Sequence, residues 1–180
     1  MRSRILGTAV LMLAAAAPLS ARPRHRPPPP YGGYVDRYGF LIGFSVGAGV
    51  VAPDPCEGCG VLAGAEVHLG AMATPEVAFM LEAGGLARDD LHHVFLAAAA
   101  QWWPDPYERF WLRGGLGIGS EGSDTEEHHD SAYPTVLAAA GVEVVRRERF
   151  TTELLVQAAA THTPHRWGRS VSVNVGFNWY

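Results

Sequence analysis

The chain lacks a long apolar run after its first residues. Beyond residue 21, Gly, Glu, Arg or His interrupts each hydrophobic stretch before it reaches the ~18 to 20 residues that a membrane-spanning helix needs. Charged residues are also scarce, at 18% of the 180 residues, while 48% are hydrophobic. These features exclude a bundle of membrane helices, so a chain that crosses a membrane would have to cross it with strands.

Lysine is absent as well, and the chain is acidic. All 14 basic residues are arginine, against 18 Asp and Glu. Without Arg2 and Arg4, which belong to the leader predicted below, the net charge is about −6. We therefore expect no nucleic-acid partner, because binding to phosphates requires an excess of positive charge.

The first segment of the chain has the pattern of a secretory leader. Arg2 and Arg4 precede an apolar stretch that ends in small residues, which predicts a cleavable signal peptide over 1–21. The next segment, 22–37, begins RPRHRPPPP and is predicted to be an extended, basic, Pro-rich tail. The remaining residues, 38–180, are predicted to form one domain.

Residues 38–180 alternate between apolar and small or polar side chains with a period of two. Turn residues divide this region into eight expected strands, each long enough to cross a bilayer at a tilt. These strands are expected at 38–50, 60–72, 77–86, 93–103, 109–119, 133–145, 150–161 and 170–180. The fold class predicted is therefore all-β, an eight-stranded antiparallel up-and-down transmembrane β-barrel.

A soluble lipocalin-like barrel also has eight alternating strands, so the choice depends on which face points inward. The face opposite the apolar one is rich in glycine, which weakens a strand exposed to water but suits a narrow lumen. Ring residues also gather near the strand ends, as membrane girdles do. These residues are Tyr38, Phe40, Trp102, Trp103, Phe110, Trp111, Tyr133, Phe150, Phe177, Trp179 and Tyr180. We therefore expect the apolar face to meet lipid, with Leu112→Arg more costly than Gly119→Arg at the rim.

The region 38–180 resembles the small eight-stranded outer-membrane barrels of the outer-membrane protein A and X type. The most specific part of the resemblance is the end of the chain, SVSVNVGFNWY. It looks like the carboxy-terminal strand that the barrel-assembly machinery reads, which makes Phe177, Trp179 and Tyr180 the expected assembly signal. Tyr180 departs from the pattern because it is out of phase with the alternating apolar residues.

The polar residues of the inward face form the main candidate site. Arg113 can bridge carboxylates, but one arginine does not neutralise four glutamates, so trapped water or help from Arg109 is expected. The competing interpretation is a selective conduit, although eight strands usually leave a lumen filled by side chains. The expected lumen cluster comprises Glu66, His68, Glu82, Gln101, Arg113, Glu143, Glu153, Gln157 and Asn174.

Three loop features could carry other chemistry. Cys56 and Cys59 are expected to form a disulfide, with a metal site or redox pair as alternatives. The acidic segment 120–131, SEGSDTEEHHDS, is expected to be a solvated loop, since no fixed ligand spacing predicts a metal site. His162 and Thr163 are minority candidates for a lipid-modifying hydrolase, with Glu153 as a distant orienting carboxylate.

The sequence thus predicts a structural or surface-interaction barrel of the bacterial outer membrane, with both termini in the periplasm. No enzymatic activity, cofactor or metal is expected. The expected partners are outer-membrane lipid and lipopolysaccharide and the barrel-assembly machinery, and the barrel is expected to be a monomer. The alternatives are a lipid A-modifying enzyme and a soluble periplasmic binding barrel.

Overall fold

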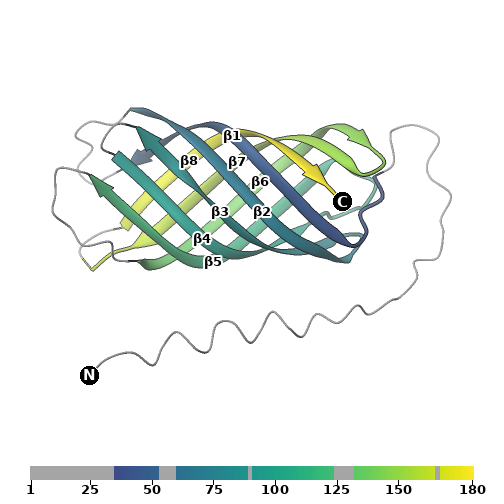
Figure 1. Cartoon of the computed structure of the whole chain (residues 1–180), viewed down its shortest axis with the longest axis horizontal. Helices are drawn as coiled ribbons and strands as arrows, with labels where there is room; N and C mark the ends of the chain where they lie inside the picture. The colour runs from purple at the N-terminus through teal and green to yellow at the C-terminus, as the bar shows by residue number, and fades with distance from the viewer. Residues whose placement is uncertain (1–34, 53–59, 89–90, 124–131, 165–166) are drawn as a thin grey trace, which may run out of the picture.

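The computed structural model describes residues 35–52, 60–88, 91–123, 132–164 and 167–180. The described residues form eight antiparallel strands that pair in chain order, and β1 pairs with β8 to close the barrel (Figure 1). The predicted fold class is confirmed. The strands are β1 (Phe40–Ala52), β2 (Val61–Thr74), β3 (Val77–Arg88), β4 (Leu91–Trp102), β5 (Phe110–Ser123), β6 (Tyr133–Arg147), β7 (Phe150–His162) and β8 (Trp167–Trp179).

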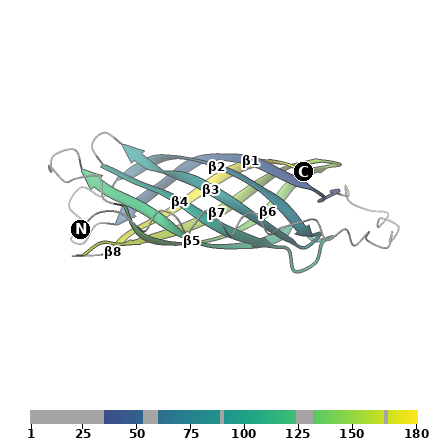
Figure 2. The same cartoon turned by 60° about the horizontal axis from the view of Figure 1, so that its bottom comes forward.

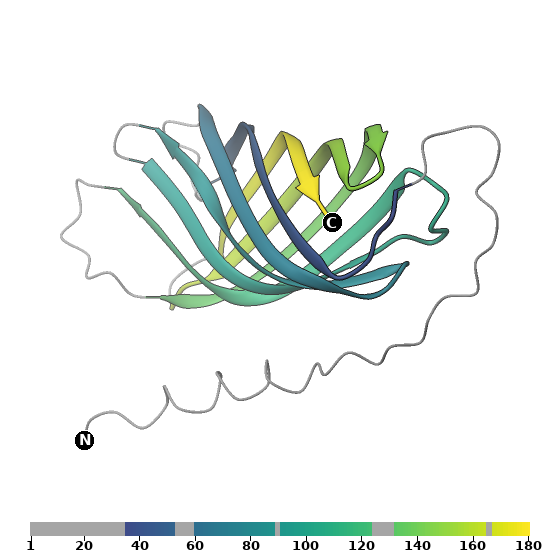
Figure 3. The same ribbon diagram turned by 45° about the vertical axis from the view of Figure 1, so that its right-hand side comes forward.

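The strands lie oblique to the long axis of the barrel, and β2 to β5 bend along their length (Figures 2 and 3). The Ala-rich stretches of β4, β6 and β7 are strands despite the intrinsic helix preference of alanine. Pairing along both edges of each strand outweighs that preference. Within the described residues, no helix is long and apolar enough to span a membrane.

The two ends of the barrel differ. β1 begins and β8 ends at the same end, which we call the turn end (Figure 1). Two of the connections there are very short, since β2 ends at Thr74 before β3 begins at Val77, and β6 ends at Arg147 before β7 begins at Phe150. The opposite end, which we call the loop end, holds the connections after β1, β3, β5 and β7. The loop-end connections are not uniformly the longer ones, since only residues 89–90 separate β3 from β4 and only 163–166 separate β7 from β8, whereas 103–109 join β4 to β5 at the turn end.

The apolar face points outward, as predicted. Each strand alternates exposed and buried side chains, and the exposed ones are the large hydrophobic residues. One such residue from each strand, in chain order, is Phe44, Val67, Phe79, Leu96, Leu116, Val136, Val156 and Val173. The corresponding buried residues are Leu41, Glu66, Glu82, Gln101, Arg113, Glu143, Glu153 and Asn174.

Four of the predicted facings are wrong, and one of them is Tyr180, which packs against the lumen residue Trp103. Trp103 and Trp111, expected in an aromatic girdle, are fully buried in the lumen. They lie an even number of residues from the buried Gln101 and Arg113, and alternation therefore turns them inward. Gly119, expected at an exposed rim, is also buried, and a Cβ there would crowd the hydroxyls of Thr135 and Thr161.

The two predicted N-terminal segments lie largely outside the described residues. Nothing described covers the signal peptide at 1–21 or most of the tail at 22–37. Val35 and Arg37, which the predicted boundary places in the tail, are buried against the turn end of the barrel. The amide of Asp36 donates to the carbonyl of Glu148 at 2.8 Å, so this short segment is part of the packed domain.

Candidate functional site

The lumen is the candidate site, because it gathers polar residues from all eight strands in a buried space. All nine residues predicted for the lumen cluster are buried. Buried polar groups are costly unless they are paired, so the partners of each group decide what the lumen can do. The structure arranges them in layers along the barrel axis.

The middle cluster consists of Glu82, Gln101 and Arg113. The Arg113 guanidinium donates to Gln101 Oε1 at 2.9 and 2.7 Å and to Glu82 Oε2 at 3.1 Å. It also lies 3.9 Å from Glu153 Oε1 and 4.8 Å from the centre of the Trp111 ring. Arg113 therefore ties β3, β4, β5 and β7 together across the lumen.

The turn-end cluster consists of Arg37, Trp103, Glu143 and Arg146. Arg37 Nη2 donates to both carboxylate oxygens of Glu143 at 2.8 and 2.7 Å, and the guanidinium stacks 4.5 Å from the Trp103 ring centre. Arg146 Nε donates to the same carboxylate at 2.6 Å. Two arginines and an indole ring thus surround one buried carboxylate at the turn end of the lumen.

Arg109 was expected to help neutralise the glutamates of the lumen, but Arg37 and Arg146 pair with Glu143 instead. Arg109 is exposed, and its Nη1 donates to the backbone carbonyl of Val144 at 3.3 Å. Sequence reasoning missed Arg37 because it precedes the first strand and meets Glu143, 106 residues later in the chain. Its only sequence signal is phase, since it lies an even number of residues before the inward-facing Leu41.

Two smaller groups complete the lumen. Ser45 Oγ donates to Glu66 Oε2 at 3.0 Å, and Asn174 Nδ2 donates to Glu66 Oε1 at 3.2 Å. His68 Nε2 lies 2.7 Å from Asn178 Oδ1, which requires a proton on that nitrogen because an amide oxygen only accepts. The lumen is therefore cross-linked by short polar contacts along most of its length.

Glycine keeps the lumen wall open for these side chains. A Cβ at Gly141 would collide with the Trp111 ring, and one at Gly43 would collide with His68 and Asn178. We predict that Gly141→Val lowers the free energy of unfolding by about 1–3 kcal/mol, since overpacking forces a rigid ring out of place. Urea titration of the barrel in lipid vesicles measures the loss. The matched substitution Gly114→Val, on the exposed face and away from close contacts, should change stability little.

A further polar group at the loop end was not singled out in the sequence. His93 Nδ1 lies 2.7 Å from Ser170 Oγ, and His93 Nε2 lies 2.8 Å from Thr161 Oγ1. Thr161 Oγ1 in turn lies 2.8 Å from Thr135 Oγ1. These four residues come from β4, β6, β7 and β8, and no local spacing brings them together, so only the pairing of the strands could have found them.

His162, the candidate base of a hydrolase, does not lie near Glu153, the carboxylate expected to orient it. His162 is exposed on the outer wall at the loop end, where its ring packs 4.6 Å from that of Trp167. Glu153 lies in the lumen near the turn end, at the other end of β7. The sequence-based triad therefore has no geometric support.

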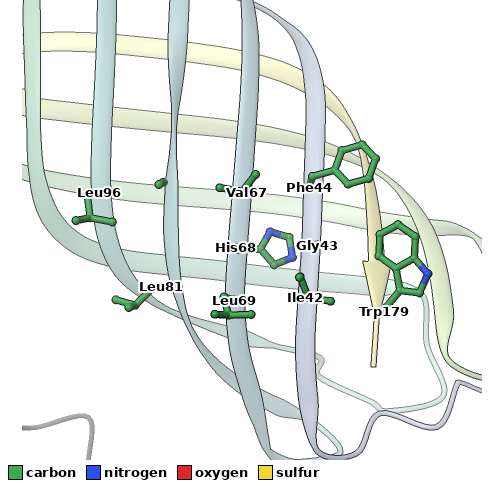
Figure 4. Close-up of a pocket in the computed structure, with 10 residues that line it drawn as sticks. Ile42, Gly43, Phe44, Val67, His68, Leu69, Leu81, Leu96 and Trp179 are labelled. Carbon is green, nitrogen blue, oxygen red and sulfur yellow. The ribbon is translucent and has the colours of Figure 1, made fainter.

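The outer wall carries a shallow apolar hollow of about 450 Å³ (Figure 4). Its lining residues come from β1, β2, β3, β4 and β8. They include Ile42, Phe44, Val67, Leu69, Leu81, Leu96 and Trp179 (Figure 4). The exposed side chains among them are apolar, so the hollow suits hydrocarbon, and His68, which also lines it, is buried with its Nε2 against Asn178.

The predicted assembly signal divides between the two sides of the wall. Phe177 stacks on Phe44 with ring centres 5.0 Å apart, and Trp179 lies 5.1 Å from Phe150, so both belong to an outer aromatic group near the turn end. Tyr180 is half-buried and packs at 6.3 Å against the lumen residue Trp103. The phase break expected at Tyr180 is thus present as an inward turn.

Two predicted loop features fall outside the described residues. Cys56 and Cys59 lie in the undescribed segment 53–59, and most of the acidic segment 120–131 lies in 124–131. Among the described residues, no group of three or more His, Cys, Asp or Glu could hold a metal ion.

Comparison with known proteins finds relatives in fold only. No family model matches the chain, and no curated protein does. The crystal structure of Neisserial surface protein A is similar with a TM-score of 0.63 and 12% identity, over 78% of this chain and 96% of that one. The crystal structure of Ail, the attachment invasion locus protein of Yersinia pestis, has a TM-score of 0.53 and 12% identity, over 79% and 99%. The chain thus has the fold of small eight-stranded outer-membrane barrels.

Proposed function

We propose that this chain is an integral barrel of a bacterial outer membrane, with a closed lumen and a structural or surface-interaction role. The single observation that carries the proposal is the facing of the wall. Phe44, Leu112 and Val173 are exposed, whereas Glu66 and Glu153 are buried. Water would penalise such a surface, and bilayer hydrocarbon would stabilise it.

The same observation argues against a soluble periplasmic carrier. A lipocalin-like barrel fills its interior with apolar side chains to hold an apolar ligand, and it exposes its polar face to water. Here the middle of the lumen holds Arg113 with Glu82, and their side chains are at most 1% exposed. An apolar ligand would meet charged side chains, not an apolar surface, in the middle of the lumen.

The arrangement of the two ends supports periplasmic termini. Outer-membrane barrels have short periplasmic turns and longer outer loops. In this chain two of the three two-residue connections, those after β2 and β6, lie at the same end as the start of β1 and the end of β8, and the two longest connections, after β1 and β5, lie at the opposite end. On this proposal the loop end faces the medium, and outer-membrane lipid and lipopolysaccharide surround the wall of a monomer inserted by the barrel-assembly machinery.

Fractionation tests the location directly. The mature protein should sediment with outer membranes, resist extraction by salt, and require detergent for release. Unheated samples should also migrate differently from boiled samples in gel electrophoresis, because a folded barrel resists detergent. Recovery in the periplasmic extract without detergent would overturn the membrane assignment.

The clusters in the lumen predict that the barrel does not conduct. Purified protein in planar bilayers should give no stable unit conductance, because the middle and turn-end clusters close the lumen independently. Arg37→Ala removes one cation from Glu143 but leaves the contacts of Arg113 intact, so this variant should also stay closed. Stepwise currents from the wild-type barrel would contradict the plug.

The proposed surface role can be compared with that of a protein of similar fold. Ail is named for attachment and invasion, and that barrel has also been crystallised with the heparin analogue sucrose octasulfate. This chain carries the acidic segment 120–131 in a loop-end connection, so we expect it to repel sulfated glycans. Binding of whole cells to immobilised heparin, with and without the chain, measures this difference.

A further inference from the structure

The loop end of the lumen contains a chain of one imidazole and three hydroxyls. It runs from Ser170 through His93 and Thr161 to Thr135, with successive distances of 2.7, 2.8 and 2.8 Å. His93, Thr135 and Thr161 are at most 2% exposed. Ser170 is 8% exposed, the largest value among the buried polar residues described, so it is the most exposed member of the chain.

The backbone favours one direction of the protons along this chain. Thr135 Oγ1 donates to the backbone carbonyl of Tyr133 at 3.2 Å, which leaves Thr161 as the donor in the contact between Thr161 and Thr135. The proton of Thr161 is then used, and Thr161 must accept from the Nε2–H of His93. A neutral imidazole protonated on Nε2 has a free lone pair on Nδ1, which leaves Ser170 as the donor to His93.

We propose that Ser170 is a nucleophile activated by His93 and that the loop end of the lumen carries out acyl transfer from small esters. Ser170 Oγ attacks the ester carbonyl and forms a bond to the acyl carbon, while its proton passes to His93 Nδ1. The carbon–oxygen bond of the ester then breaks, and the alcohol leaves with that proton. Water returns the serine by the same route and releases the acid. Thr161 and Thr135 are positioning residues that fix the tautomer of His93.

The neighbours of the pair indicate the acyl group. Ser170 lies opposite Val51 in the ladder with β1, and His93 lies opposite Leu86 in the ladder with β3. Val51, Leu62 and Leu86 form a buried apolar cluster, against which Leu91 packs. An apolar wall beside the nucleophile fits a short aliphatic acyl chain. The site is separate from the structural role proposed above and differs from the minority pair His162 and Thr163.

The test uses full-length barrel folded in detergent or vesicles and the serine reagent diisopropyl fluorophosphate. An ordinary serine does not react with this reagent, whereas an activated one forms an oxygen–phosphorus bond and releases fluoride. Mass spectrometry should place the adduct of the wild-type chain on Ser170. We expect Ser170→Ala to abolish labelling and His93→Gln to slow it about 100-fold, the loss typical of a missing general base.

Matched controls separate activation from folding. Ser172 is also buried in the lumen on β8, but it accepts from Asn174 instead of contacting His93, so Ser172→Ala should label at the wild-type rate. Thr161→Val should slow labelling, and Thr161→Ser should restore it because the hydroxyl chain is rebuilt. Folding of each variant is checked by its heat-modifiable mobility. An unlabelled wild-type barrel, or an adduct that is independent of His93, would overturn the proposal and leave the membrane assignment untouched.

Discussion

Leu116→Arg is expected to lower the free energy of unfolding in lipid vesicles by about 2–4 kcal/mol. Leu116 lies in the middle of β5 with its side chain 70% exposed on the outer wall, so the substitution places a guanidinium in bilayer hydrocarbon. Leu116 tests the effect of the charge better than Leu112 does, because Leu112 is only 39% exposed and its replacement would also remove packing contacts. Urea titration followed by tryptophan fluorescence measures the change.

A matched substitution at the edge of the wall separates depth from charge. Val61 is the first residue of β2 at the loop end and is 66% exposed, so Val61→Arg can reach water and should cost only about 0–1 kcal/mol. Gly119→Arg does not serve this purpose, because Gly119 faces the lumen. Equal losses for Leu116→Arg and Val61→Arg would argue against a bilayer around this wall.

The sequence predicted the strands well because their pattern is local and repeated. Alternation within β1, for example, places Phe44 and Val46 outward and Ser45 inward without any knowledge of the neighbouring strands. A period of two has only two phases, and a slip by one residue would expose every inward glutamate to lipid. The facing of each strand was therefore fixed by residues that lie next to one another in the chain.

Aromatic residues near strand ends were harder to place. Trp103 and Trp111 were assigned by residue type to a membrane girdle, although their phase relative to Gln101 and Arg113 already placed them inside. Both rings are useful in the lumen, because they pack beneath the guanidiniums of Arg37 and Arg113. Phase is thus a better guide than residue type at these positions.

The contacts between polar side chains could not be predicted, because they depend on which strands face each other across the lumen. Ser170 and His93 are 77 residues apart, and Arg37 and Glu143 are 106 apart. Alternation predicts that Ser170 and Glu143 point inward, but it does not give their height along the barrel. That height follows from the register between strands, such as the pairing of Ser170 with Val51. The register cannot be read from a single sequence.

Arg113→Met is expected to have the largest effect, a loss of about 3–5 kcal/mol in the free energy of unfolding. The guanidinium is 1% exposed and holds Gln101 and Glu82 through three hydrogen bonds. Methionine has a similar length, so the lost energy comes mainly from carboxylates left buried without a cation. The remaining arginines of the lumen, Arg37 and Arg146, already pair with Glu143 and are not free to replace it.

A double-mutant cycle with Glu82→Gln distinguishes charge from packing. If uncompensated charge causes the loss, removing the Glu82 carboxylate should restore part of the stability of Arg113→Met, giving a coupling energy of about 0.5–3 kcal/mol. Gln157 offers a matched control, because it is buried in the same lumen on β7 without being an ion-pair partner of Arg113 among the described contacts. Gln157→Met should therefore show no such coupling to Arg113→Met. Additive losses for Arg113→Met and Glu82→Gln would mean that Arg113 stabilises the barrel by filling space rather than by neutralising charge.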